Sequence, residues 1–276
     1  MYDIDRAAVH AWWLGLAAAL RAEGLDVPAR LSWPLDLERH WQDPALLLSQ
    51  ACGIPLVTSL IGKVSVVGAF RYTAPGCEGI DYRSELVVRD DDHARSIEDL
   101  RDRVAAFNDP RSHSGCIALR ALVAPLAHGG RFFLRTIRSG SHRASLGLVR
   151  GGRADVAAVD CVSLAALRQR FPGQWDGLRV LSSTAPAPGL PLITSGARPT
   201  AELDALRRGL AAACVDPDLA AVRDRLSIDG FERATAEDWA CIGAMRAAGT
   251  ELLDFDAASS LENAAARRLW HIQCEF

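Results

Sequence analysis

Several common features are missing from this sequence of 276 residues. It contains no run of about 18 apolar residues, so no membrane-spanning helix is expected. Lys63 is the only lysine, and with the arginines there are 31 basic residues against 34 acidic ones, for a formal net charge of -3. Nucleic-acid binding needs a strongly basic face, which this balance does not favour. The chain also lacks a P-loop, a G-x-G-x-x-G turn after a strand and a nucleophile elbow, the usual signs of nucleotide binding and serine hydrolysis.

The seven cysteines form no C-x-x-C pair, which argues against a structural zinc site. Most are expected to be buried as small apolar side chains. Cys52 and Cys77 each lie next to a glycine near turn signals, so a disulfide between them is an alternative. Metal binding by His113, His142 and Asp160 is another, because these ligand types suit zinc or iron. The leading interpretation has no cofactor and no metal.

The N-terminal segment predicts an amphipathic helix over residues 5–23 rather than an export signal. Asp3 and Asp5 precede Arg6, so a basic start is missing, and the apolar stretch contains His10 without a clean cleavage site after it. We therefore expect a cytoplasmic protein as the sequence stands, and a periplasmic one if the true start lies upstream.

The remainder alternates strands with helices. Strands are predicted at 29–33, 45–50, 63–72, 81–89, 103–107, 131–137, 154–160 and 178–183, with another in the proline-rich stretch that follows. Helices are predicted at 35–41, after the turn at 108–115, after 141, from 161 to about 170, and at 200–213, 217–226 and 235–249. Such alternation favours an α/β fold in which mainly parallel sheets are flanked by helices.

Two polar crossings, near 89–95 and 184–190, bracket a middle segment that contains its own strand–helix units. This predicts a two-lobed protein with one lobe inserted into the other. Lobe 1 would comprise residues 1–88 and 187–276, and lobe 2 residues 89–186. Hinge strands are expected near 84–92 and 183–191.

The first candidate site is the turn Ser112-His113-Ser114-Gly115, which opens an apolar helix. A helix N-terminus carries unpaired N–H groups and a partial positive charge. Two hydroxyls and an imidazole add donors that suit a phosphate-like group, and Gly115 would let a ligand approach the backbone. A simple N-cap by Ser112 or Ser114 explains the same pattern, so both readings stay open.

The second candidate is the turn from Ser139 to His142, where Ser139 or Ser141 caps a helix and His142 could donate to an anion. The third is Asp160, at the end of an apolar strand, which would act either as a helix cap or as an acid that reads the ligand. Other expected ligand contacts are Ser49 and Gln50, which end the predicted strand 45–50, and Tyr2. Arg89 or Arg138 could add positive electrostatic potential at the anion site.

The order of these motifs is similar to that of a known family. It consists of a Y-x-S-x-L-V-V strand, an N-D-P-x-S-x-S-G turn, a G-S-H turn, a D-V-A strand and a proline-rich return, at 82–88, 108–115, 140–142, 155–157 and 184–191. This arrangement resembles the phosphonate- and phosphite-binding proteins of ABC importers, which are type 2 periplasmic binding proteins. The match is best over about 80–195.

The resemblance implies a two-lobed clamshell that holds an oxyanion between its lobes. The anion would sit on the helix start at Ser112, His113 and Ser114 and be met by His142. In some relatives, an acidic residue near the position of Asp160 contacts the other end of the ligand. His113 departs from the small residue usual in the first turn. Ser49 and Gln50 stand where relatives carry tyrosine, and the first strand of the family fold is almost absent.

The leading hypothesis is therefore a monomeric solute-binding protein, without catalytic activity, for phosphonate, phosphite, phosphate or a similar anion. Its partners would be the small anion and an ABC transporter permease, with no nucleic acid and no membrane insertion. One alternative is an enzyme on the same fold, with His113, His142 and Asp160 as acid–base residues. Another is a ligand sensor that acts through a regulator.

Overall fold

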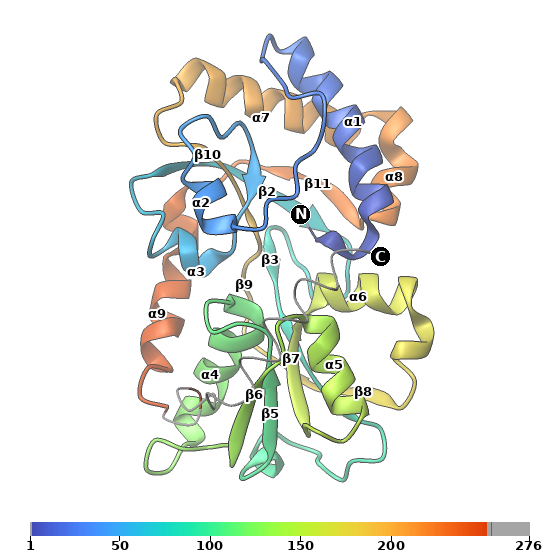
Figure 1. Ribbon diagram of the computed structural model, residues 1–276, viewed down its shortest axis with the longest axis vertical. Helices are drawn as coiled ribbons and strands as arrows, with labels where there is room; N and C mark the ends of the chain where they lie inside the picture. The colour runs from blue at the N-terminus through green and yellow to red at the C-terminus, as the bar shows by residue number, and fades with distance from the viewer. Residues whose placement is uncertain (1, 253–254, 256–276) are drawn as a thin grey trace. The chain divides into compact units, whose positions relative to one another are not determined.

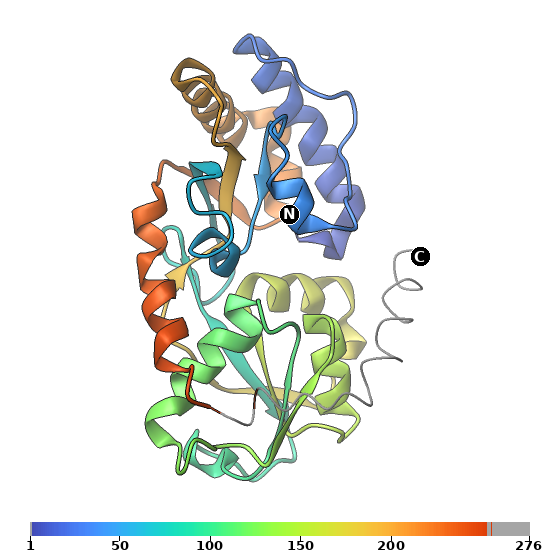
Figure 2. The ribbon, with the colours of Figure 1, turned by 60° about the vertical axis from the view of Figure 1, so that its left-hand side comes forward.

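The computed structural model describes residues 2–252 and 255. By their internal contacts these residues divide into two compact units. Unit 1 contains residues up to Tyr82 and Pro186–Gly243, and unit 2 contains Arg83–Ala185 and the chain from Ala244. Figures 1 and 2 show both units with their helices and strands. Within the described ranges, no helix is both long and apolar enough to span a membrane.

Unit 1 is built on a four-stranded sheet with the order β1-β10-β2-β11, and every neighbouring pair in it is antiparallel. A small second sheet pairs β3 with β9. The strands are β1 (Ser49–Gln50), β2 (Val64–Tyr72), β3 (Asp81–Tyr82), β9 (Ala187–Pro188), β10 (Pro191–Ser195) and β11 (Ile228–Glu232). The helices are α1 (Arg6–Ala22), α2 (Leu37–Trp41), α3 (Gly53–Leu56), α7 (Thr200–Val215) and α8 (Ala220–Arg225).

The core of unit 1 lies where α1 and α7 pack together over the sheet. The amphipathic helix predicted over 5–23 is α1, and Asp5 caps it by accepting a hydrogen bond from the Ala8 amide. The apolar stripe of α1, which includes Trp12, Leu16 and Leu20, is almost fully buried.

Unit 2 is built on a five-stranded sheet with the order β6-β5-β7-β4-β8. Its strands are β4 (Ser84–Arg89), β5 (Val104–Phe107), β6 (Arg135–Arg138), β7 (Val156–Asp160) and β8 (Leu178–Ser183). β5 runs parallel to β6 and β7, whereas β4 runs antiparallel to β7 and β8. Its helices are α4 (Ala118–Val123), α5 (His142–Arg150) and α6 (Cys161–Arg170), while α9 (Ala240–Ala248) spans the boundary between the units.

The helices of unit 2 cover different faces of its sheet. Leu86 and Val88 of β4 join Leu119 and Val123 of α4 in one buried cluster. Helix α5 contacts β4, β5 and β7, and α6 contacts β4 and β7; both lie away from α4 (Figure 1). Because side chains alternate between the two faces of a strand, apolar runs such as Val156–Val159 are buried on both sides.

The α/β class and the type 2 binding-protein fold are confirmed, but the prediction of mainly parallel sheets is wrong in detail. The sheet of unit 1 is antiparallel, and that of unit 2 is mixed. Hydrophobic periodicity reveals that a strand exists but not its direction. Among the described elements, only the strand–helix units between β5 and β7 make the crossovers that enforce parallel pairing.

Two predicted strands of unit 1 are largely missing. Residues 29–33 contain no strand; Leu31 packs at the edge of the core, and the Arg6 guanidinium lies over the Trp33 ring. Of the predicted strand 45–50, only Ser49–Gln50 pairs, and it pairs antiparallel with β10. The preceding Leu46 carbonyl instead accepts hydrogen bonds from the Thr194 hydroxyl and other donors, so the ladder stops there.

The unit boundaries also differ from the predicted ones. All of β4 pairs within the unit 2 sheet, although its first residues were assigned to lobe 1. Beyond α9, the Gly249 carbonyl accepts a hydrogen bond from the Arg120 guanidinium of unit 2 at 3.1 Å. The predicted lobe 1 segment 187–276 therefore contributes residues 244–252 to unit 2, and most of its last part lies outside the described residues. Cys52 and Cys77 are thiols rather than a disulfide.

Candidate functional site

The candidate site is built at one edge of the unit 2 sheet. The parallel strands β5, β6 and β7 end at Phe107, Arg138 and Asp160, and the carboxyl ends of parallel strands meet at one edge. The Ser139 amide donates to the Phe107 carbonyl at 2.8 Å, and the Gly140 amide donates to the Asn108 carbonyl at 3.0 Å. The two predicted turns are therefore joined to each other directly.

The first turn begins with a capping serine. The Ser112 hydroxyl oxygen accepts a hydrogen bond from the Gly115 amide at 3.2 Å, which confirms the capping alternative for this residue. The expected helix opens as a wide π-helical turn over His113–Ile117 and continues as the short helix α4. Such turns are frequent at functional sites.

The second turn is capped in the same way. The Ser141 hydroxyl oxygen accepts a hydrogen bond from the Ala144 amide at 3.1 Å, so Ser141 rather than Ser139 is the cap. His142 is then the first residue of α5. Its side chain is 14% exposed, so its ring is held largely inside the unit.

The two turns meet through their side chains. The Ser114 hydroxyl lies 3.1 Å from Nε2 of His142, and the same nitrogen lies 3.1 Å from Oδ2 of Asp160. Three residues that are 28 and 18 positions apart in sequence thus form one cluster. The prediction that Ser114 and His142 face the same gap is confirmed by this contact, whereas their binding of one small anion stays a prediction.

Both oxygens of Asp160 have protein donors. Oδ1 accepts from the Ser163 amide at 2.7 Å, so Asp160 caps α6, and Oδ2 faces His142. Burial alone would raise the pKa of this carboxyl, but hydrogen bonds from His142 and Ser163 outweigh it and lower the pKa from its usual value. Asp160 is therefore a buried carboxylate whose contact with His142 fixes that ring.

Gly115 is required for a reason that the sequence did not reveal. A Cβ atom on Gly115 would lie 2.0 Å from Oδ1 of Asn108 and 3.0 Å from Cε1 of His142. The space above the glycine is therefore filled by protein side chains, whereas the sequence suggested that a ligand would approach there. Asn108 was read only as a turn residue, and its position in the site is new.

His113 is buried beside this cluster and is 2% exposed. Burial lowers the pKa of its imidazole to about 4, because a charged ring loses its hydration there. His113 is consequently a neutral residue at neutral pH. A neutral imidazole still has one N–H group to donate, so the ligand contact expected of His113 stays a prediction.

The Ser139 hydroxyl holds the second turn in place through three polar contacts. Its hydroxyl lies 3.1 Å from the Phe107 carbonyl, 3.0 Å from the Ser141 carbonyl and 2.6 Å from the Ser145 hydroxyl. These contacts tie the end of β5 to the first turn of α5. Sequence reasoning considered Ser139 as a cap and missed this role, because its partners lie both 32 residues before it and 6 after it.

The two arginines that were expected to add positive electrostatic potential do not contact the cluster of Ser114, His142 and Asp160. Arg138 pairs with Asp109. Arg89 lies at the other end of β4 from Ser84, the residue that pairs with Asp160. In the described chain, no arginine or lysine hydrogen-bonds to Ser112, Ser114, Ser141 or His142, the side chains expected to contact the anion.

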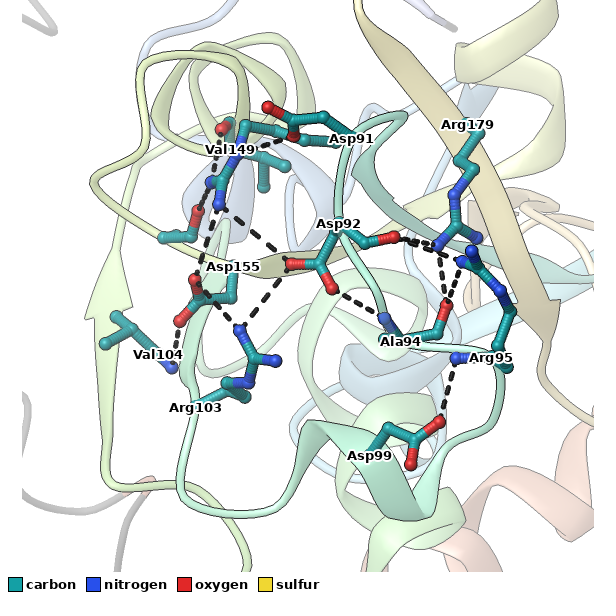
Figure 3. Close-up of polar contacts among 12 residues, drawn as sticks. Asp91, Asp92, Ala94, Arg95, Asp99, Arg103, Val104, Val149, Asp155 and Arg179 are labelled. Atoms are coloured by element: carbon teal, nitrogen blue, oxygen red, sulfur yellow. Dashed lines mark hydrogen bonds and ion pairs between the residues drawn. The ribbon is translucent and has the colours of Figure 1, made fainter.

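Arg89 instead belongs to a network of charges at the opposite end of the sheet (Figure 3). Asp92, 3% exposed, lies between Arg89 at 3.9 Å and Arg103 at 3.6 Å, and both arginines also reach Asp155. Asp92 also accepts a hydrogen bond from the Ala94 amide at 2.8 Å. This network fixes the loop after β4 and is separate from the candidate site.

The remaining predicted contacts lie in unit 1. Gln50 is buried, and its Nε2 donates to the Tyr72 hydroxyl at 3.2 Å. The rings of Tyr2 and Tyr72 stack edge to face with centroids 5.7 Å apart. Ser49 donates its hydroxyl proton to the Gln50 carbonyl. Tyr2, Gln50 and Tyr72 therefore form a second polar and aromatic cluster, in which Tyr72 was not foreseen.

Across residues 2–252 and 255, no three histidine, cysteine, aspartate or glutamate side chains gather as metal ligands. His142 and Asp160 interact as a pair, and the third neighbour is a serine hydroxyl. This geometry suits hydrogen bonding to an anion better than coordination of a cation.

The fold is that of the type 2 periplasmic class of substrate-binding proteins. Residues 46–239 match the family described as "ABC transporter, phosphonate, periplasmic substrate-binding protein". The chain belongs to this family, whose members are binding proteins and not enzymes. No match was found among curated proteins.

Solved structures of low sequence identity share the fold. PhnD1 from Prochlorococcus marinus, in complex with methylphosphonate, is 14% identical with a TM-score of 0.72, over 90% of this chain and 95% of that one. A binding protein component of an ABC phosphonate transporter from Pseudomonas aeruginosa is 17% identical with a TM-score of 0.70, over 95% and 89%. XAC2383 from Xanthomonas citri, bound to chloride ion, is 16% identical with a TM-score of 0.66, over 87% and 90%.

Proposed function

We propose that the cluster at Ser114 and His142 binds the oxyanion group of a small phosphonate or phosphite, as the ligand site of an ABC importer's binding protein. The observation that carries this proposal is the 3.1 Å contact between the Ser114 hydroxyl and His142 Nε2, which joins the two turns. The hydroxyl oxygens of Ser112 and Ser141 accept hydrogen bonds from backbone amides, so their own O–H groups are available to donate to a ligand.

The strength of such a site follows from its donors. A hydrogen bond to a charged group contributes about 1.5–3 kcal/mol. Several of these bonds, reduced by the entropy cost of association, are enough for micromolar affinity or better. Gln50, Ser49 and Tyr2 are proposed as further ligand contacts from unit 1.

The family description supports two further proposals. The chain acts in the periplasm, and its protein partner is the permease of an ABC transporter. We also propose that it works as a monomer. Methylphosphonate is the first ligand to test, because PhnD1 was solved in complex with it.

The test is calorimetric titration with methylphosphonate, phosphite, phosphate and sulfate. Wild-type protein should bind at least one phosphorus oxyanion, and Ser114→Ala should weaken that binding about 10-fold or more through loss of one charge-assisted hydrogen bond. Ser96→Ala, which changes an exposed serine in the segment before β5, is the matched control and should bind like wild type. If folded protein binds none of the four anions, the proposal is wrong.

A further inference from the structure

Two side chains that meet in the site each have a buried polar atom without a hydrogen-bond partner. The atoms are Nδ1 of His142 and Oδ1 of Asn108. The two side chains meet above Gly115, where the position of an added Cβ lies 2.0 Å from Asn108 Oδ1 and 3.0 Å from His142 Cε1. A buried polar atom without a partner destabilises the fold, so two neighbours in this state call for an explanation.

Their chemistry explains why they do not pair with each other. Asp160 is a carboxylate, so Nε2 of His142 must carry a hydrogen to bond with it. A neutral ring with its hydrogen on Nε2 has only a lone pair on Nδ1. That lone pair and the Asn108 carbonyl oxygen are both acceptors, and neither can satisfy the other.

One added proton satisfies both atoms. With hydrogens on both ring nitrogens, Nε2 donates to Asp160, and Nδ1 becomes a donor that the Asn108 carbonyl oxygen can accept from once the two side chains move into hydrogen-bond reach. The ring then carries a positive charge next to the Ser114 hydroxyl. An arriving anion therefore meets a neutral imidazolium–carboxylate pair instead of the uncompensated negative charge of Asp160.

We propose that the site binds its oxyanion together with one proton, which His142 takes up on Nδ1, and that Asn108 is the positioning residue that holds this proton. The proposal rests on the proposed oxyanion site. The proton comes from solvent when the ligand is fully ionised, or from the ligand's own acidic O–H group. One N–H bond forms, and no other covalent bond changes.

Asp160 is the carboxylate that contacts the His142 ring, and the other titratable groups near it are neutral or paired elsewhere. On the adjoining turn, His113 is neutral because burial lowers its pKa to about 4. In the loop after β5, Asp109 is paired with Arg138. On α5 itself, the neighbouring Arg143 donates to Gln174 at 2.9 Å. On β4, Glu85 accepts from Ser183 and is partly exposed, while Arg89 belongs to the network at the far end of the sheet.

The experiment measures the protons taken up when methylphosphonate binds. Titrations in two buffers of different ionisation enthalpy are made at about two pH units above the ordinary histidine pKa of about 6.5. Wild-type protein should take up close to one proton per ligand. Nitrogen NMR of ring-labelled protein should show His142 gaining a hydrogen on Nδ1. His10→Gln, which changes an exposed histidine of unit 1, should leave the uptake unchanged.

Two substitutions test Asn108. Asn108→Ala removes the acceptor, and both the affinity at this pH and the proton uptake should fall, the affinity about 10-fold. Asn108→Asp places a carboxylate beside Nδ1, so the ring should already be protonated without ligand and the uptake should disappear while binding persists. This second variant guards against an effect of Asn108→Ala on folding, because its readout is proton number rather than stability.

Binding with no proton uptake would overturn the inference while leaving the oxyanion site intact, since Asn108 could then present its amide nitrogen to a neutral ring. The inference also fails if phosphorus NMR places the proton on the ligand while the His142 ring stays neutral. Absence of binding by all four anions would overturn both this inference and the proposed function.

Discussion

Substitution of Gly115 by alanine should damage both stability and ligand binding. The new Cβ would lie 2.0 Å from Oδ1 and 2.7 Å from Cγ of Asn108, and 3.0 Å from Cε1 of His142. All three distances are well inside van der Waals contact, so both side chains must move. Overpacking of this kind typically costs about 1–3 kcal/mol. Movement of His142 also breaks its contact with Ser114, which should weaken ligand binding about 10-fold or more.

Gly147→Ala is the matched control on helix α5. No atom lies within 4 Å of a Cβ placed on Gly147. In an exposed helical position, alanine is favoured over glycine by about 0.5–1 kcal/mol. The two glycine-to-alanine changes are therefore expected to shift stability in opposite directions, although both sites lie in helical turns of the same unit.

The double variant Gly115→Ala/Asn108→Ala identifies the cause. Loss of the Asn108 side chain removes the two shortest contacts, so the double variant should recover much of the stability that Gly115→Ala loses. Urea unfolding of the four proteins in this cycle measures the coupling free energy, and calorimetry measures ligand affinity. Additive losses in the cycle, or a Gly115→Ala protein as stable as wild type, would refute the packing that we describe.

Three further outcomes are expected. Asp92→Ala should cost about 1–3 kcal/mol in urea unfolding without changing ligand affinity, because the buried Ala94 amide loses its acceptor, whereas Asp91→Ala, at an aspartate with a 79% exposed side chain, should cost less than about 1 kcal/mol. Between about pH 6.5 and 4, the free energy of unfolding of wild type should fall by at most about 3 kcal/mol on account of His113, because in that range only the unfolded chain takes up the His113 proton. His113→Asn should lack this fall, and equal slopes of unfolding free energy against pH for the two proteins would contradict the reasoning. Gln50→Ala should weaken methylphosphonate binding in calorimetry, and unchanged affinity would remove Gln50 from the site.

Local signals predicted the elements that carry the site. The apolar run before Asp160 predicted β7, and the hydroxyl-rich turns predicted the helix starts at Ser112 and Ser141. The prediction that Ser114 and His142 face one another is confirmed by their contact. These features depend on short-range chemistry, namely capping and strand periodicity, which neighbouring residues determine.

Long-range contacts could not be predicted in the same way. Asn108 looks like an ordinary turn residue, and its importance depends on His142, which is brought to it by the β5–β6 pairing. The direction of the strands was also misjudged, because β4 enters its sheet from unit 1 and runs against β7. The charge network around Asp92 lay in a segment that the sequence presented only as a polar crossing.

The most direct test of the account is a single NMR titration with methylphosphonate, in which the amide signals of Ser114 and His142 are followed together. The account predicts that both signals shift along one binding curve, with the same Kd as calorimetry gives. Ligand binding that leaves both signals unmoved would contradict it.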